Sequence, residues 1–174
     1  NKVTVTTNPI HGSTTFTISA WIYKTNTNYG AIVSNRGYNG SLVSGLTFGY
    51  DANDGNGINS QAIIIANGNN SGQNSIWSSP ANSIPQNSWK HVVLVWQNGS
   101  TPVVYINGST VTLTPWSFAT PITTIYWGAT NTAPAIGNGS QAYDGGGWFG
   151  GKIDEVGIWN RALSAQEISD LYNS

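Results

Sequence analysis

Apolar and polar residues alternate along much of this chain with a period of two, which is the repeat of a β-strand. The clearest run covers residues 16–23, Phe-Thr-Ile-Ser-Ala-Trp-Ile-Tyr, where every second side chain from Phe16 to Ile22 is apolar. Trp21 and Tyr23 fall on the opposite face of this strand. Similar runs, rich in β-branched and aromatic residues, lie at 31–33, 46–50, 62–66, 89–96, 103–106, 123–127 and 152–159. We therefore predict a protein built from many short strands.

Turn signals separate these runs. The dipeptide Asn-Gly tolerates the positive φ angles that a tight hairpin requires. It occurs at 39–40, 56–57, 67–68, 98–99, 107–108 and 138–139. The clearest hairpin connection is 98–102, Asn-Gly-Ser-Thr-Pro, between two apolar runs. The spacing of strands and turns predicts antiparallel pairing.

One helix is predicted, at the end of the sequence. Ser164-Ala-Gln-Glu167 has the pattern of a capping box, in which the Ser and Glu side chains satisfy free backbone amides of the first turn. Leu163 and Ile168 occupy the two positions of a hydrophobic staple. We expect a helix of about two turns over 165–172. Many strands with one terminal helix favour an antiparallel β-sandwich.

Composition excludes several classes of function. Charged residues make up 7% of the chain, against about 25% in an ordinary soluble domain, and the net charge is −1. The few basic residues do not supply the positive surface of a nucleic-acid-binding protein. No apolar run approaches the ~20 residues of a membrane span. Cys is absent, which excludes disulfides and thiolate metal sites.

The domain organisation is simple. No Pro-rich linker, charge shift or fixed-period repeat divides the 174 residues. The sequence starts at Asn1 and contains no Met. We therefore expect residues 1–174 to be a single domain excised from a larger protein.

Four segments form a recognisable series: 16–22, 88–95, 104–108 and the closing segment 149–172, Phe-Gly-Gly-Lys-Ile-Asp-Glu-Val-Gly-Ile-Trp-Asn-Arg-Ala-Leu-Ser-Ala-Gln-Glu-Ile-Ser-Asp-Leu-Tyr. In order and spacing they resemble the concanavalin A-like, laminin-G-like jelly-roll domains, from about residue 3 to 172. The resemblance implies two curved antiparallel sheets. Members of this family are mostly non-catalytic and bind glycans or proteins outside cells. We therefore expect an extracellular or cell-surface module, tethered to other domains of its parent protein.

The carboxylates do not form a recognisable catalytic pair. Glycoside hydrolysis generally uses two carboxyl groups on either side of the scissile bond. Asp154 and Glu155 are consecutive in a predicted strand, so they should point to opposite faces. Glu167 belongs to the helix cap, and His91 is expected to be packed within its strand. We predict that the chain is not an enzyme.

A structural calcium ion is implied by the family resemblance alone. The Asp of the family's Ile-Asp-Glu-Val strand, which is Asp154 here, often helps to hold one, together with carbonyl groups near the first strand. This chain offers no acid at 6–12, where Asn8 is the candidate side-chain ligand. The alternative is that no calcium is bound.

Aromatic residues are the remaining functional signal, because flat rings with a few polar neighbours are typical of sugar-binding sites. Trp21, Trp89, Trp96, Trp127 and Trp159 lie in strand runs, where packing is expected. The predicted loop platforms, followed by their predicted polar partners, are Trp148, Trp116, Trp77, Tyr38, Tyr143, Asp144, Arg36 and Asn35. Trp148 leads because glycines at 145–147 and 150–151 should leave room beside its ring.

Two classes of function remain open at this stage. The first is a non-catalytic carbohydrate-binding module for a poly- or oligosaccharide, which the low charge predicts to be neutral. The second is a structural or adhesive spacer that binds a protein or nothing. A continuous exposed aromatic strip with polar neighbours would favour the first class, and wholly buried aromatic residues would favour the second.

Overall fold

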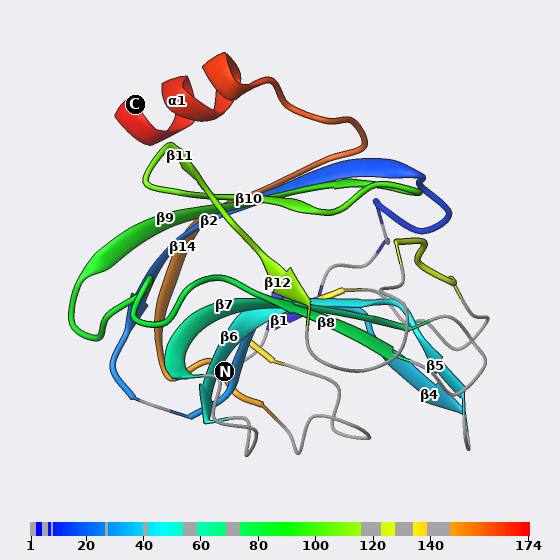
Figure 1. Ribbon diagram of the computed structural model, residues 1–174, viewed down its shortest axis with the longest axis horizontal. Helices are drawn as coiled ribbons and strands as arrows, with labels where there is room; N and C mark the ends of the chain where they lie inside the picture. The colour runs from blue at the N-terminus through cyan, green and yellow to red at the C-terminus, as the bar shows by residue number, and fades with distance from the viewer. Residues whose placement is uncertain are drawn as a thin grey trace.

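Two antiparallel sheets face each other and a single helix lies outside one of them (Figure 1). The computed structural model describes residues 3–4, 7, 9–26, 28–39, 42–53, 59–68, 74–115, 123–127, 134–138 and 147–174. This architecture is a jelly-roll β-sandwich with one short C-terminal helix, as the sequence predicts.

The five-stranded sheet carries the helix on its outer face. Its order is β11 (Ser109–Val111), β10 (Val103–Ile106), β9 (Trp89–Gln97), β2 (Thr15–Lys24) and β14 (Gly151–Trp159). The central pair runs in unbroken register from Thr15 opposite Gln97 to Tyr23 opposite Trp89. This register fixes which side chains of β2 and β9 share a face.

The seven-stranded sheet forms the other layer. Its order is β1 (Val3–Thr4), β13 (Ala135–Ile136), β3 (Gly30–Ser34), β6 (Leu46–Asn53), β7 (Asn59–Gly68), β8 (Asn74–Ser78) and β12 (Thr114–Pro115). A separate hairpin pairs β4 (Gly37–Asn39) with β5 (Leu42–Ser44).

The core lies between the sheets and is built by alternate residues of each strand. Phe16, Ile18 and Ala20 of β2 are fully buried, and they meet Phe48 and Ile65 from the opposite sheet in one cluster. The predicted alternation along 16–23 is thereby confirmed. The intervening residues of β2 face outward, toward the helix and the solvent.

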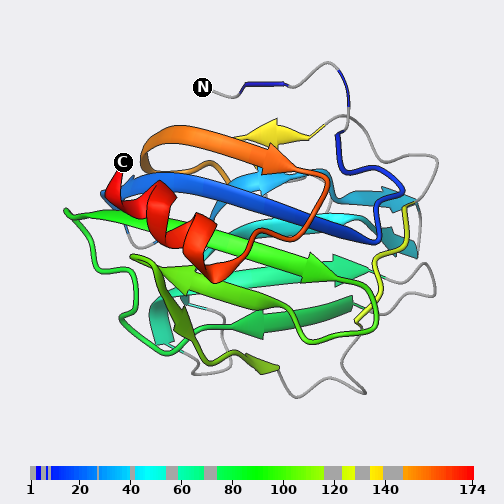
Figure 2. The same cartoon turned by 90° about the horizontal axis from the view of Figure 1, so that it is seen from above.

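The helix α1 (Ala165–Asn173) lies over β2 and β9 (Figure 2). Its capping box is formed as predicted, with Ser164 Oγ accepting from the Glu167 amide and the Glu167 carboxylate accepting from the Ser164 amide. Leu163 and Ile168 are buried against Val93 on the outer face of the five-stranded sheet. The helix therefore covers part of this face.

Several local predictions are confirmed and others are wrong. Turns occur at 98–99 and 107–108, where Asn107 and Gly108 have φ angles of +50° and +75°. Asn67 and Gly68 instead lie inside β7, where pairing with β8 replaces the predicted turn. The prediction of a strand at 123–127 is wrong. The backbone of this segment forms hydrogen bonds with loops and strand ends instead of with a neighbouring strand; the Tyr126 carbonyl, for example, accepts from the Gly45 amide.

Candidate functional site

Three aromatic side chains lie on the outer face of the five-stranded sheet, beside the end of the helix. Trp21 and Tyr23 are two residues apart on β2, so they point to the same side. Trp89 of β9 lies directly opposite Tyr23, and the two ring centroids are 5.6 Å apart. Trp89 is 41% exposed, which is unusual for so large an apolar side chain in a strand. We call these three rings, on neighbouring positions of one face, the aromatic strip.

Trp21 is held in place by its neighbours. Its ring stacks on Tyr172 of α1, with centroids 5.8 Å apart, and lies 5.3 Å from the ring of His91. His91 is buried, as predicted, and its Nε2 lies 2.8 Å from Ser19 Oγ. Burial lowers the pKa of His91, so the imidazole is neutral at pH 7. The indole of Trp21 therefore rests on a rigid, uncharged support.

A β-bulge in β14 places two carboxylates beside this strip. Asp154 pairs with Trp21, whereas the next paired residue, Gly157, lies opposite Ser19, which is two positions earlier on β2. Two residues of β14, Glu155 and Val156, therefore stand opposite one residue of β2. Glu155 takes a left-handed φ of +48°, and its amide donates to Asp154 Oδ1 at 2.9 Å. Val156 packs against the core.

The prediction that Asp154 and Glu155 point to opposite faces is wrong. Strict alternation holds only for a regular pleat, and the bulge adds one residue at this point. Both carboxylates are exposed and both line the same hollow.

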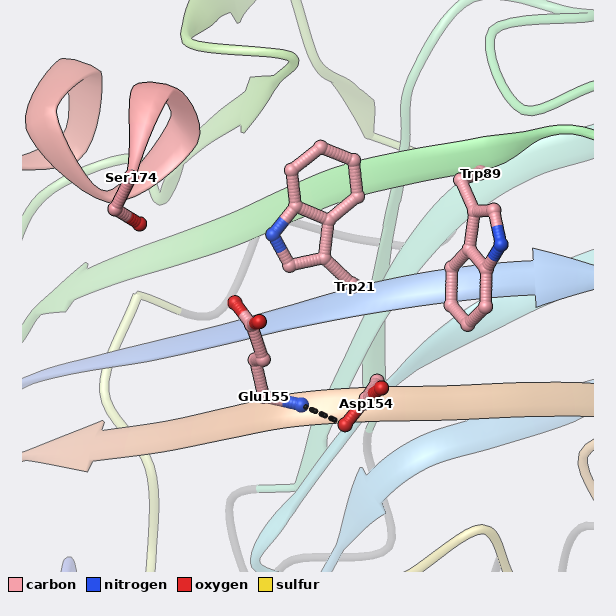
Figure 3. A pocket seen from close by; sticks show the side chains of 5 residues that line it. All are labelled: Trp21, Trp89, Asp154, Glu155 and Ser174. Atoms are coloured by element: carbon pink, nitrogen blue, oxygen red, sulfur yellow. Dashed lines mark hydrogen bonds between the residues drawn. The ribbon is translucent and has the colours of Figure 1, made fainter.

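The hollow has a volume of about 240 Å³ and is lined by Trp21, Trp89, Asp154, Glu155 and Ser174 (Figure 3). In this view the two indoles lie on one side, from β2 and β9, and the two carboxylates lie on the other, from β14. Lys152 lies two residues before Asp154, and its Nζ is 5.8 Å from the centroid of the Tyr23 ring. Within the described parts of the chain, no basic side chain forms a salt bridge with Asp154 or Glu155.

This arrangement combines two chemical properties. The indole faces offer flat apolar surfaces on which a ring with C–H groups can stack. The carboxylates offer acceptors for hydroxyl or ammonium donors. Such a combination suits a small, polar, ring-shaped ligand with a donor-rich edge.

Of the predicted loop platforms, Trp148 is exposed, at 48%, and forms an isolated bridge with Asn138. Two of the glycines beside it also have a packing role within the protein. A Cβ at Gly147 would overlap the ring of Tyr29, and one at Gly150 would overlap the side chain of Asn26. These glycines therefore admit neighbouring side chains of the protein itself.

Trp77 and its predicted polar companions are buried. Trp77 lies in β8 at 5% exposure and packs in the core, because β7 and β12 pair with its strand on both sides. Its prediction as an exposed platform is wrong. Arg36 and Asn35 are also buried, and Asn35 Oδ1 accepts from the Leu46 amide at 3.0 Å. They are therefore not surface donors for a ligand at Trp148.

The remaining predicted residues cannot be compared with the structure. Trp116, Tyr143, Asp144 and Asn8 lie outside the described residues. Tyr38 is placed in β4, but its side chain is not described. Among the residues that are described, no group of three or more acidic or histidine side chains gathers as a metal site. Calcium binding at Asp154 stays a prediction.

The sequence carried one signal for the aromatic strip. Within 16–23 the face opposite the core residues contains Trp21 and Tyr23 rather than only small polar residues. Two large rings on the outer face of a strand need either a cover or a ligand. The contribution of Trp89 depends on the register between β2 and β9, which no local pattern reveals.

Comparison with known sequences identifies the class of protein. Residues 1–169 match the laminin-G-like family of the concanavalin A-like lectin/glucanases superfamily, and the chain belongs to this family. No curated protein sequence matches the chain. Within the described residues, no helix is long and apolar enough to cross a membrane.

Solved structures share the fold at low sequence identity. The CBM40 module of the Ruminococcus gnavus IT-sialidase superposes with a TM-score of 0.72 at 14% identity, over 99% of this chain and 92% of that one. A Bacteroides ovatus protein proposed to bind carbohydrate gives 0.66 at 18% identity, over 97% of this chain. The binding domain of botulinum neurotoxin DC, in complex with SialylT, gives 0.63 at 17% identity, over 99% of this chain. The chain spans only 44% and 39% of the last two.

Proposed function

We propose that this chain is a non-catalytic carbohydrate-binding module of an extracellular protein, and that it stacks sugars in the outer-face hollow. The observation that carries the proposal is the exposed ring of Trp89, which lines the hollow together with Trp21 and faces two carboxylates. The carbohydrate ligands of structural neighbours, such as the sialyllactose bound to the R. gnavus CBM40, support the class of ligand.

The geometry of the carboxylates favours binding over hydrolysis. Asp154 and Glu155 are consecutive on one strand and are linked by the bond from the Glu155 amide to Asp154 Oδ1. They therefore approach a bound sugar from the same side, whereas glycosidases place their two carboxyl groups on either side of the scissile bond. The role that fits them is acceptance of hydrogen bonds from sugar hydroxyls.

The low charge of the chain supports a glycan without acidic groups. Binding at a single shallow site should be weak, with a Kd in the micromolar to millimolar range, or about 4–8 kcal/mol. Tethering to other modules of the parent protein would raise the effective affinity. A mere spacer would not need an exposed tryptophan strip, so the strip favours the binding function.

Two exposed tryptophans allow a matched test. Trp89→Ala removes a wall of the hollow, and Trp148→Ala removes the predicted loop platform at similar exposure, 41% against 48%. On a polysaccharide that retards the wild type in affinity electrophoresis, we expect Trp89→Ala to weaken binding about tenfold, equivalent to ~1.4 kcal/mol. Trp148→Ala should migrate like the wild type.

The opposite pattern would move the site to the loop edge. Retardation unchanged in both variants would contradict both platforms. Absence of binding across a broad glycan array would reject the carbohydrate function and leave the spacer.

A further inference from the structure

We propose that the hollow selects sugars that carry a free, protonated amine, that is, oligosaccharides of amino sugars. This inference rests on the proposed function, because it names the class of glycan for the same hollow. Four observations carry it: the charge of the hollow, the position of Lys152, the two indole walls and the support beneath them.

The hollow is acidic. Asp154 and Glu155 bring two carboxylates to one small space, and no described basic side chain pairs with either. A cation bound in this space is attracted by both carboxylates. An ammonium group donates three hydrogen bonds, whereas each hydroxyl donates one, so it suits this set of acceptors better.

Lys152, on the same strand as the two carboxylates, does not line the hollow. Lys152 shares the outer face of β14 with Asp154, because the two residues are paired with Tyr23 and Trp21 on β2. Its Nζ lies over the ring of Tyr23, at 5.8 Å from the centroid. The lysine is thus placed beside the aromatic strip and does not line the space between the carboxylates and the indoles.

The indole walls favour the same cation. The face of an indole attracts a positive charge within about 6 Å of its centroid, and tryptophan does so better than the other aromatic residues. The same faces stack on the C–H groups of a sugar ring. Trp21 and Trp89 therefore recognise both halves of an amino sugar, the apolar ring and the charged substituent.

The walls are preorganised for this task. Trp21 packs against both Tyr172 and the buried His91, and Asp154 Oδ1 accepts a hydrogen bond from the amide of Glu155. These protein side chains therefore lose little conformational entropy when a ligand binds. An anionic sugar would meet the two carboxylates, so this hollow should reject sialylated glycans even though the R. gnavus neighbour is seen with one.

The test uses sugars that differ in one group. Titration calorimetry would compare glucosamine oligomers, their fully N-acetylated counterparts of equal length, and 3′-sialyllactose. We expect the free-amine oligomer to bind at least tenfold more tightly than the acetylated one, with no binding of sialyllactose. Raising the salt from 50 to 500 mM should weaken only the free-amine complex, since screening acts on charge pairs.

Variants identify the groups responsible. Asp154→Asn and Glu155→Gln should each reduce the preference for the free amine severalfold, because the loss of a negative charge weakens binding of the free-amine oligomer more than binding of the acetylated one. Asp170→Asn is the matched control, because Asp170 is an exposed carboxylate of α1 outside the hollow, bonded to Gln166. This variant should keep the wild-type preference for the free amine. It thereby shows whether the loss of any one surface carboxylate, rather than of a carboxylate in the hollow, weakens binding of a polycation.

Each outcome separates this inference from the proposed function. Equal affinity for free and acetylated oligomers, lost in Trp89→Ala, would overturn the amine selectivity and keep the sugar platform. If Asp170→Asn and Asp154→Asn weaken the preference equally, the preference comes from the overall charge of the chain, and the proposed amine selectivity of the hollow is wrong. If a lysine oligopeptide binds as tightly as the amino sugar, the hollow recognises amines without a sugar ring, and the proposal of an amino-sugar ligand is wrong. No binding of any glycan would reject the proposed function itself.

Discussion

Tyr172, in the last turn of α1, stacks on Trp21 of β2 with ring centroids 5.8 Å apart and an interplanar angle of 24°. The helix therefore does more than cover apolar residues, because its end supports one wall of the hollow. Ser174, two residues further along, lines the hollow itself. The proposed sugar site and the docking of the helix therefore share the contact between Tyr172 and Trp21.

This contact can be tested with a conservative pair of variants. Tyr172→Ala removes the ring that supports Trp21, so we expect weaker glycan binding by about threefold to tenfold, while far-UV circular dichroism shows the sheet intact. Tyr172→Phe keeps the stacked ring and should bind like the wild type. Equal binding by the alanine variant would show that Trp21 needs no support from the helix.

The strained backbone at Glu155 predicts an effect on stability. A left-handed φ of +48° costs a non-glycine residue about 1 kcal/mol, and more for a β-branched one. Glu155→Gly should therefore raise the free energy of unfolding by about 1 kcal/mol, whereas Glu155→Val should lower it by a similar amount. Urea denaturation measures both. A valine variant as stable as the glycine variant would contradict the strain.

Lys24 is a buried cation that weakens the fold at neutral pH. Its side chain is 1% exposed, and its Nζ lies 5.1 Å from the centroid of the Tyr50 ring. Among the described residues, this nitrogen has no hydrogen-bond partner. Burial lowers the pKa of Lys24 to about 8, from 10.5. Lys24→Met should therefore raise the free energy of unfolding at pH 7 by about 1–3 kcal/mol.

The same lysine predicts a dependence on pH. Between pH 8 and 10.5 the unfolded chain binds more protons at Lys24 than the folded chain, so stability rises with pH there. Burial raises the pKa of Tyr50, which opposes this gain above pH 10. The rise should thus be clearest from pH 8 to 10, and Lys24→Met should remove it. A wild-type curve that falls across this range in urea titrations would contradict the burial of a charged amine.

A structural calcium ion at Asp154 can be tested by thermal denaturation. An ion that binds only the folded chain raises the Tm, so a chelator should lower it, and Asp154→Ala should lower it and abolish the chelator effect. Unchanged curves in the wild type with and without chelator would reject the ion. Calcium held by Asp154 would also compete with an amino sugar, so the glycan titrations should be run with and without chelator.

The helix and the core strands could be predicted because their signals are local. Ser164, Glu167 and the pair Leu163 and Ile168 contain all the chemistry of the helix start within six residues. The alternation along β2 likewise needs no partner to be read. Asn-Gly turns were reliable at 98–99 and 107–108, where apolar strands flank them, and failed at Asn67, where pairing with β8 outweighs the turn preference.

The hollow could not be predicted because it depends on long-range pairing. The bulge after Asp154 arises where β14 pairs with β2, and nothing in the local sequence Ile-Asp-Glu-Val predicts a bulge. Trp89 becomes a neighbour of Tyr23 only through the register of β9. Trp77 lies in a serine-rich segment and reads as a loop residue, but strands that pair on both sides of β8 bury it.

The alternation of β2 has a consequence for protein engineering. Positions 16, 18, 20 and 22 build the core, whereas Trp21 belongs to the hollow, on the other side of the same strand. A combinatorial library that randomises positions 21, 89, 154 and 155 therefore leaves every core contact of β2 in place. Such a library would retain a folded scaffold while exploring new ligand specificities, much as variable loops do on an antibody, but on the flat of a sheet.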